Sequence, residues 1–182
     1  MLRWNVPKKD SGFTLIEMLA VTIIIGIVSA VAVPNLLGLL NNARVTDGTA
    51  DIEGAIKEAK RQAIRFSQTC VIEIATTTID GNTRHIVIPD RTVGGNNNRC
   101  LLEQRVLPEG VIVTDDIPSN IQISSKGNIG NTADYVANGT RSFWTIDVSH
   151  PNAGTSKCLI VEGLFGDIQT GIIQGGNCNT NL

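Results

Sequence analysis

The chain has 182 residues, which suits one domain of ordinary size with an appendage and argues against a multi-domain enzyme. Charged residues make up 18% and hydrophobic residues 42%, which excludes long polar disorder, a collagen-like repeat and a chain made only of coiled coil. The net charge of -2 argues against a generally nucleic-acid-binding surface, and an aromatic content of 4% is too low for a base-stacking platform.

The N-terminal region combines a basic start with a long uncharged run. Residues 1–12 carry three basic side chains and one acidic side chain, and no residue from Met18 to Ala43 is charged. As a helix this run would extend about 39 Å, more than the roughly 30 Å that a hydrocarbon core requires. We therefore expect a transmembrane helix over residues 13–34, with its basic flank in the cytoplasm and the rest of the chain on the far side.

A secretory signal peptide is the alternative, because Ala30-x-Ala32 meets the general requirement of a cleavage site. Glu17 is the objection to it. A carboxylate inside an apolar segment costs roughly 2.5–3.5 kcal/mol on insertion-type scales, so it calls for a partner or a function.

The sequence around Glu17 is informative. Residues 12–17 read GFTLIE, and the segment continues with MLAV at 18–21 and VPNLL at 33–37. This segment closely resembles the processing site of type IV prepilins and pseudopilins. The resemblance implies that an inner-membrane peptidase removes residues 1–12 as a leader by cutting after Gly12, and methylates the new N-terminal Phe13. The apolar helix then stays attached to the product, which remains in the membrane.

The resemblance also gives roles to Glu17 and Pro34. An unpaired carboxylate is very costly in an apolar filament core, whereas one that is paired with an amine is tolerated. The α-amino group of Phe13 in a neighbouring subunit is the expected partner of Glu17, and this pair would select the register of assembly. Pro34 and Gly38 weaken the helix, and related pilins loosen it around this proline.

Residues 35–68 are expected to continue the helix in amphipathic form. A four-three spacing places one narrow stripe on the helix, which we expect to pack against a sheet, formed by Val45, Thr49, Ile52, Ile56, Ala59, Ala63 and Phe66. Off the stripe lie Asp47, Asp51, Glu53, Lys57, Glu58, Arg61 and Arg65. A coiled coil is the alternative, but the repeat lasts only about three heptads and has small residues at several seam positions. Lys60, Arg61 and Arg65 suit the helix C-terminus.

Residues 69–182 show short β-rich segments separated by Gly, Asn, Asp and Pro. Residues 71–74 and 85–88 flank Asp80-Gly81-Asn82, which predicts a hairpin. Further strands are predicted over residues 100–107, 111–114, 121–124, 142–148 and 159–164, and a closing strand over 163–168. Residues 90–98 are expected to form an exposed loop.

The order of one long N-terminal helix and then an antiparallel sheet is that of the α+β pilin fold. The order is also similar to the H-type pseudopilin and FimT-like branch (GspH/FimT). That resemblance depends on the helix end at residues 58–64 leading into 70–72, on residues 125–129, and on the closing strand.

All four cysteines lie beyond the expected membrane helix, in an oxidising compartment, and their even number favours disulfides over metal binding or free thiols. Three connectivities can be drawn. The resemblance to pilins, which commonly close their C-terminal segment by a bridge, favours Cys158 with Cys178. This choice leaves Cys70 with Cys100.

Residues for enzyme chemistry are few. His85 and His150 lie 65 positions apart, and the motifs of zinc proteases, serine hydrolases and phosphate-binding loops are absent from the sequence. Ser124-Ser125-Lys126 does not form a convincing serine–lysine pair, because adjacent residues on a strand point to opposite faces. The loops at Asp115-Asp116 and Asp80-Gly81-Asn82 offer too few ligands for calcium. We expect no enzyme activity, no catalytic residue, no cofactor and no bound metal.

We therefore expect a structural minor pilin of a type IV pilus, with an H-type minor pseudopilin of a type II secretion system as the alternative. A signal-anchored periplasmic enzyme is the candidate from another class. The expected partners are other pilin or pseudopilin subunits, the prepilin peptidase, the inner-membrane assembly platform, and membrane lipid before assembly. The expected location is the inner membrane, then a filament. Residues 159–182 contain no Lys or Arg, so we do not expect this tail to bind DNA.

Overall fold

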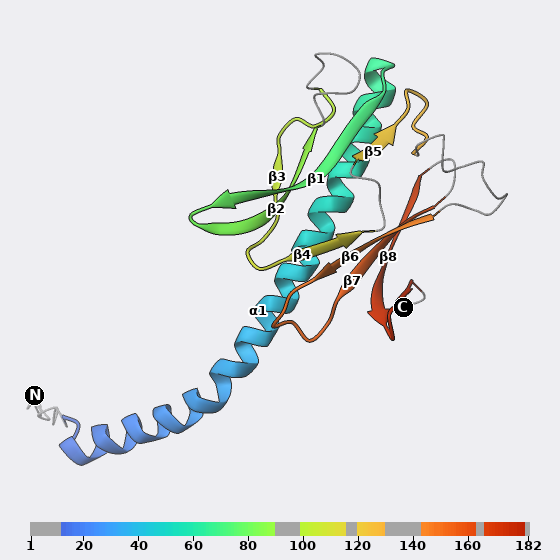
Figure 1. Ribbon diagram of the computed structural model, residues 1–182. Helices are drawn as coiled ribbons and strands as arrows, with labels where there is room; N and C mark the ends of the chain where they lie inside the picture. The colour runs from blue at the N-terminus through green and yellow to red at the C-terminus, as the bar shows by residue number, and fades with distance from the viewer. Residues whose placement is uncertain (1–11, 90–98, 116–119, 130–142, 163–165, 181–182) are drawn as a thin grey trace, which may run out of the picture. The chain divides into compact units, whose positions relative to one another are not determined.

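The computed structural model describes residues 12–89, 99–115, 120–129, 143–162 and 166–180 (Figure 1). The chain divides into two compact units, the first reaching to Leu37 and the second running from Gly38 to Leu182. Helix α1, Leu15–Phe66, begins in the first unit and ends in the second, and Pro34 lies within its span. Within the described residues, no helix combines the length and the apolar character that a membrane span needs.

Two antiparallel sheets make up the β structure. The first has four strands in the order β3-β2-β1-β5: β1 is Cys70–Ile79, β2 is Asn82–Pro89, β3 is Arg105–Val106 and β5 is Asn120–Ile123. The second has five in the order β4-β6-β7-β8-β9: β4 is Ile112–Asp115, β6 is Phe143–Ser149, β7 is Lys157–Glu162, β8 is Asp167–Gln174 and β9 is Asn177–Asn179. The single sheet expected from the sequence is thus divided in two.

The β1–β2 hairpin confirms the prediction made from its turn residues. Ile79 pairs with Asn82, and the two residues between them, Asp80 and Gly81, have φ angles of 52° and 79°. Positive φ at both central positions is the geometry that matches the twist of the flanking strands. Both strands extend further toward this turn than the sequence pattern indicated.

Two strand predictions need correction, and one strand was missed. The strand expected over residues 100–107 is reduced to β3, Arg105–Val106, because the backbone N–H of Leu102 is bound by the side chain of Glu58 and not by a neighbouring strand. The closing strand expected over 163–168 is β8, Asp167–Gln174, which begins and ends later. Strand β9 was not predicted, because three residues are too few to show an alternation. The loop expected over residues 90–98 lies outside the described residues.

The core of the second unit lies between α1 and the two sheets (Figure 1). The predicted stripe of α1 is buried from Val45 to Ala63, and only its last member, Phe66, is exposed. The stripe contacts strand residues such as Ile72, Ile121 and Ile146, which confirms the packing expected against β structure. The buried face is wider than the stripe, since Ala55, Glu58 and Gln62 are buried too. The expectation that Glu58 lies off the packed face was therefore wrong.

Helix α1 ends in a compact C-terminal motif. Ser67 has a φ of 51°, the backbone N–H of Gln68 donates to the carbonyl of Ala63 over 3.1 Å, and Ser67 donates to Ile64 over 3.3 Å. This pair of hydrogen bonds is the Schellman arrangement, which satisfies carbonyls that the helix leaves without partners. The chain therefore turns sharply after Phe66 and enters β1 at Cys70.

Candidate functional site

The first turn of α1 brings together the residues predicted for processing and assembly. Gly12 and Phe13 lie directly before the helix, and Thr14 is its N-cap. The Glu17 carboxylate accepts hydrogen bonds from the Thr14 backbone N–H over 3.3 Å and from its hydroxyl over 3.4 Å. In return, the Glu17 N–H donates to the Thr14 hydroxyl over 3.3 Å. This reciprocal pair is a capping box, which the sequence Thr-Leu-Ile-Glu permits but which the prediction had not considered.

The cap gives Glu17 a role within its own chain. Its carboxylate satisfies the backbone N–H of Thr14 at the helix N-terminus, where negative charge is also favoured by the macrodipole. An ionised carboxylate has about four acceptor positions on two oxygens, so the two bonds from Thr14 leave capacity for an ammonium group. Capping and pairing with the Phe13 amine of another subunit are therefore compatible.

The first unit displays apolar side chains all around α1. The large ones described as exposed include Phe13, Leu15, Ile16, Met18, Leu19, Val21, Ile23, Ile24, Ile25, Ile27 and Val28. The hydroxyl of Thr22 donates to the carbonyl of Leu19 over 2.8 Å, so this polar group is satisfied within the helix. A helix that is apolar on every side needs apolar surroundings, either lipid or other helices.

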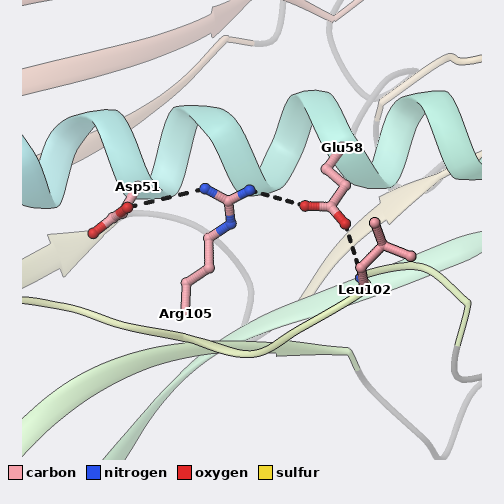
Figure 2. Close-up of polar contacts among 4 residues, drawn as sticks. All are labelled: Asp51, Glu58, Leu102 and Arg105. Carbon is pink, nitrogen blue, oxygen red and sulfur yellow. Dashed lines mark hydrogen bonds and ion pairs between the residues drawn. The ribbon is translucent and has the colours of Figure 1, made fainter.

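Arg105 joins β3 to α1 through two carboxylates (Figure 2). One nitrogen of its guanidinium lies 2.9 Å from Glu58 Oε2, and another lies 3.9 Å from Asp51 Oδ1. The other oxygen of Glu58 accepts the backbone N–H of Leu102 over 2.8 Å. One buried helix residue therefore fixes both Arg105 and the segment before β3.

These contacts change the pKa values of the two acids in opposite directions. Burial opposes ionisation of Glu58, but the Leu102 N–H and the Arg105 guanidinium outweigh it and lower the Glu58 pKa below its ordinary value. Partial burial raises the Asp51 pKa, which nearby Asp47 reinforces and Arg105 opposes. Glu58 is thus the carboxylate that the structure holds ionised.

Gly54 makes room for this arrangement. A Cβ atom at position 54 would lie 2.9 Å from Nη1 of Arg105, so the missing side chain lets the guanidinium lie across the helix. Asp51, Gly54 and Glu58 are spaced by three and four, which places them on one helix face. That spacing is the one sequence signal that could have indicated a long cation lying between two acids.

Asn41 and Asn42 hold the connection between β6 and β7 against α1. The Asn42 side-chain oxygen accepts the backbone N–H of Gly154 over 2.9 Å and that of Thr155 over 3.3 Å. The Asn41 amide donates to the carbonyl of Asn152 over 3.2 Å. The two asparagines thus bind backbone groups of this connection, which sequence reasoning missed because neither is part of a periodic pattern.

Both expected disulfides are present. Cys70 is bonded to Cys100 with the Cα atoms 5.3 Å apart, and Cys158 is bonded to Cys178 with the Cα atoms 5.8 Å apart. The second bridge links β7 to β9 across β8, which lies between these two strands in the sheet. Gly171 of β8 permits this, because a Cβ there would lie 2.3 Å from the Asn179 carbonyl oxygen. Its missing side chain lets β9 lie close enough for the bond.

The residues weighed for enzyme chemistry have local structural contacts. The Ser124 hydroxyl accepts the backbone N–H groups of Lys126 and Asn128, which stabilises a turn. His150 Nδ1 accepts the backbone N–H of Asn152, and His85 lies in β2 opposite Thr76. Within the described ranges, no three His, Cys, Asp or Glu side chains group in a way that could hold a metal ion.

Three comparisons relate the chain to known proteins. The prokaryotic N-terminal methylation motif matches residues 7–33. The type II secretion system core protein G of Pseudomonas aeruginosa is 41% identical over 46 residues, which are 25% of this chain and 32% of that protein. The crystal structure of the type IV minor pilin FimU of P. aeruginosa aligns over 74% of this chain and 92% of its own, at 10% identity and a TM-score of 0.48.

An N-terminal helix that packs on antiparallel sheets and begins in a methylation motif defines a pilin-like protein. The chain carries the prokaryotic N-terminal methylation motif at residues 7–33 and is similar over a short stretch to a type II secretion system core protein. The chain spans about a third of the length of protein G in this match.

Proposed function

We propose that this protein is a structural minor pilin of a type IV pilus, cleaved after Gly12, methylated on Phe13 and assembled through α1. The observation that carries the proposal is the first turn of α1, where a capped Glu17 opens a helix with apolar side chains on every side. Such a helix suits an inner-membrane anchor before assembly and a helix bundle in the filament afterwards.

The proposal includes the partners that such a protein requires. A prepilin peptidase would cut the leader, an inner-membrane platform would drive assembly, and other pilin subunits would surround α1. The protein has no catalytic role in this proposal, because α1 supplies the contacts that assembly needs.

Processing is the direct test. We expect protein from membrane fractions to begin at N-methylated Phe13, as measured by intact-mass analysis and N-terminal sequencing. Gly12→Asp should leave the leader attached while the helix stays in the membrane. A wild-type N-terminus near Val33, with the protein released from the membrane, would establish an ordinary signal peptide and reject the proposal.

An H-type minor pseudopilin of a type II secretion system is the second candidate, and the similarity to protein G favours it. The two candidates share processing and differ in what deletion removes. Deletion should abolish or reduce surface pili and leave exoprotein release intact if the protein is a minor pilin. Loss of secretion with normal pili would support the pseudopilin. Unchanged filaments together with the loss of an enzymatic activity would reject both.

A further inference from the structure

Strand β1 has a free edge toward the turn of the β1–β2 hairpin. Strand β5 pairs with β1 only from Cys70 to Glu73, whereas β1 and β2 stay paired up to the turn at Ile79 and Asn82. Within the part of the chain that the structure describes, no strand therefore lies beside residues 74–79 on the side of β1 that faces away from β2. Figure 1 shows this end of the hairpin projecting past β5.

The turn decides which backbone groups point toward this free edge. In a hairpin with a two-residue turn, Ile79 and Asn82 exchange both backbone hydrogen bonds, and bonded and non-bonded pairs alternate from there along the strands. The residues of β1 in the non-bonded pairs, whose N–H and C=O groups point away from β2, are Ile74, Thr76 and Thr78. Strand β2 confirms this alternation, because the carbonyl of His85, opposite Thr76, accepts the backbone N–H of Leu107 from outside the hairpin over 2.9 Å.

The sequence of the free edge lacks the features that usually protect an edge strand. Residues 74–79 read IATTTI, which contains no charged residue, no proline and no glycine. The side chains of Thr76 and Thr78 are exposed. Edge strands are ordinarily blocked by lysine, proline or a bulge, because their unpaired N–H and C=O groups recruit another strand. An exposed, uncharged edge that is rich in β-branched residues is therefore suited to pairing with a further strand.

The same segment of a second copy fits this edge. If two copies pair antiparallel about Thr77, Thr76 of each copy lies opposite Thr78 of the other, and each of these pairs exchanges both of its backbone hydrogen bonds. Between them Thr77 lies opposite its own counterpart, and Ile79 lies opposite Ala75. Threonine pairs and aliphatic pairs of this kind stabilise neighbouring strands. Like charges do not meet along this stretch, because it contains no charged residue.

Strand β5 limits the register that two copies can adopt. Pairing about Thr76 would bring Ile79 of one copy opposite Glu73 of the other, where Asn120 of β5 is already paired. Pairing about Thr77 brings Ile79 only as far as Ala75, two residues short of the end of β5. The structure therefore favours the register about Thr77.

We propose that the free edge of β1 is an interface between two copies of this chain, which pair antiparallel about Thr77. The two hairpins then form one continuous sheet in the order β2-β1-β1-β2. A two-fold axis uses the same surface on both copies and closes the interface, so it gives a dimer and not a growing fibre. The inference goes beyond the role proposed for α1 in assembly and does not depend on it, because it involves only the β-rich domain.

The test uses the full chain in nonionic detergent with one added cysteine. Directly opposite residues of a non-bonded antiparallel pair have Cα atoms about 4.5 Å apart, which is within disulfide range. Mild oxidation of Thr77→Cys should therefore give a covalent dimer, and non-reducing peptide mapping should show the link at position 77 with both native disulfides intact. Thr83→Cys is the matched control, since this residue of β2 lies opposite Thr78 near the same turn. In the dimer its two copies are three strand spacings apart, about 14 Å, so we expect at least about tenfold less cross-linking.

Thr78→Pro in the Thr77→Cys background tests the backbone bonds across the interface. The Thr78 N–H points toward the free edge, so proline removes a donor from the interface and none from the hairpin. Because the two-fold axis repeats the loss, we expect at least about tenfold less dimer. Thr83→Pro removes the outward N–H of the opposite residue and should leave the dimer yield unchanged. Thr78→Lys keeps the backbone donor but adds a charge that blocks the edge, so it gives the same answer if the proline variant does not fold.

Melting temperatures establish which variants are folded. Equal dimer yields from Thr77→Cys and Thr83→Cys would overturn the proposal, as would a Thr77→Cys protein that stays monomeric. An undiminished yield in a folded Thr78→Pro or Thr78→Lys variant would also overturn it. Cross-linking of position 77 to a different protein in whole membranes, without the dimer, would assign the edge to another partner and reject the second copy as its occupant.

Discussion

At the scale of single residues, Glu17 has a local role in capping α1 and a proposed role between subunits. Its carboxylate completes the capping box with Thr14, which stabilises the first turn of a helix by about 1 kcal/mol. Its charge is costly in an apolar environment unless a cation is near. Substitutions that separate the cap from the charge can therefore tell which requirement governs assembly.

We expect Glu17→Gln to keep most of the cap, because a side-chain carbonyl can accept the Thr14 N–H, but to lose the charge. If pairing with the Phe13 amine sets register, Glu17→Gln and Glu17→Val should both lower recovery in sheared filaments, with membrane insertion unchanged. Thr14→Val is the matched control, since it weakens the cap and keeps the charge. Normal recovery of Glu17→Gln, with loss in Thr14→Val, would show that the cap alone matters.

Glu58 should make the stability of the β-rich domain depend on pH. Its pKa is lowered in the folded chain, so its contribution is present above the unfolded value of about 4.3 and is lost as pH falls through the folded pKa. Glu58→Gln should cost about 1–3 kcal/mol near neutral pH and much less near pH 3, measured by thermal melts of the full chain. The Asp51 pKa is raised in the folded chain, so its contribution to stability decreases as pH rises. An equal cost at both pH values would exclude an ionised Glu58.

At the scale of elements, the sequence predicts the packed stripe of α1 correctly but wrongly places Glu58 outside the packed face. The four-three spacing of apolar residues indicates the stripe from Val45 to Ala63, because helix periodicity alone decides which residues meet a sheet. The partner of Glu58 lies 47 positions away at Arg105. No local pattern carries information on so distant a partner, so a buried acid was assigned to the solvent side.

Gly54 provides a test of how α1 and β3 meet. Alanine is favoured over glycine by roughly 1 kcal/mol within a helix, but here its Cβ would displace the Arg105 guanidinium. We expect Gly54→Ala to raise the free energy of unfolding of an Arg105→Met background by about 0.5–1 kcal/mol. In wild type the same substitution should stabilise the protein by less, or destabilise it. Chemical denaturation of the four proteins measures the coupling. Equal effects in both backgrounds would contradict the close packing of Arg105 on Gly54.

The strands show the same division between local and distant information. Asp80-Gly81 predicts the β1–β2 hairpin, since a turn and its flanking strands are neighbours in sequence. The separation into two sheets depends on pairings such as Cys70 with Ile123, more than 50 positions apart. Alternation within each strand does not specify such partners, so one sheet was expected where two exist.

At the scale of the whole molecule, each sheet has its own disulfide. Cys70–Cys100 ties β1 to the segment before β3, and Cys158–Cys178 ties β7 to β9. The second bond closes a loop across a sequence separation of 20 residues, and restricting the unfolded chain in this way contributes roughly 3 kcal/mol. The two bonds therefore stabilise different parts of the fold.

We expect the paired variant Cys158→Ser with Cys178→Ser, which leaves no odd thiol, to lower the melting temperature and steady-state level of the full chain. Hydrogen exchange should rise in β8 and β9 and stay unchanged around β1. Cys70→Ser with Cys100→Ser should give the reverse pattern. A uniform rise across both sheets in either variant would contradict their independence.

Gly171→Val should interfere with formation of the Cys158–Cys178 bond, because its side chain would occupy space that the Asn179 backbone takes. Non-reducing peptide mapping of exported protein should show free thiols at these two positions, with Cys70–Cys100 intact. Gly175→Val is the comparison for a glycine with an open environment, though its φ of 58° adds strain. A full yield of the bond in Gly171→Val would mean that β9 does not need this glycine.

The position of Arg105 has a mechanical consequence. Its two carboxylate partners are seven residues apart on α1, about 10.5 Å at about 1.5 Å per residue. The guanidinium therefore bridges two turns of the helix. Stretching these turns would have to part both ion pairs as well as the backbone hydrogen bonds. From Met18 to Ala43 the helix contains no charged side chain that could form such a bridge. Pro34 in this run has no backbone N–H to donate a helical hydrogen bond. In the proposed filament, tension along α1 would therefore lengthen the helix first in that uncharged run, while the turns that carry the β-rich domain keep their shape.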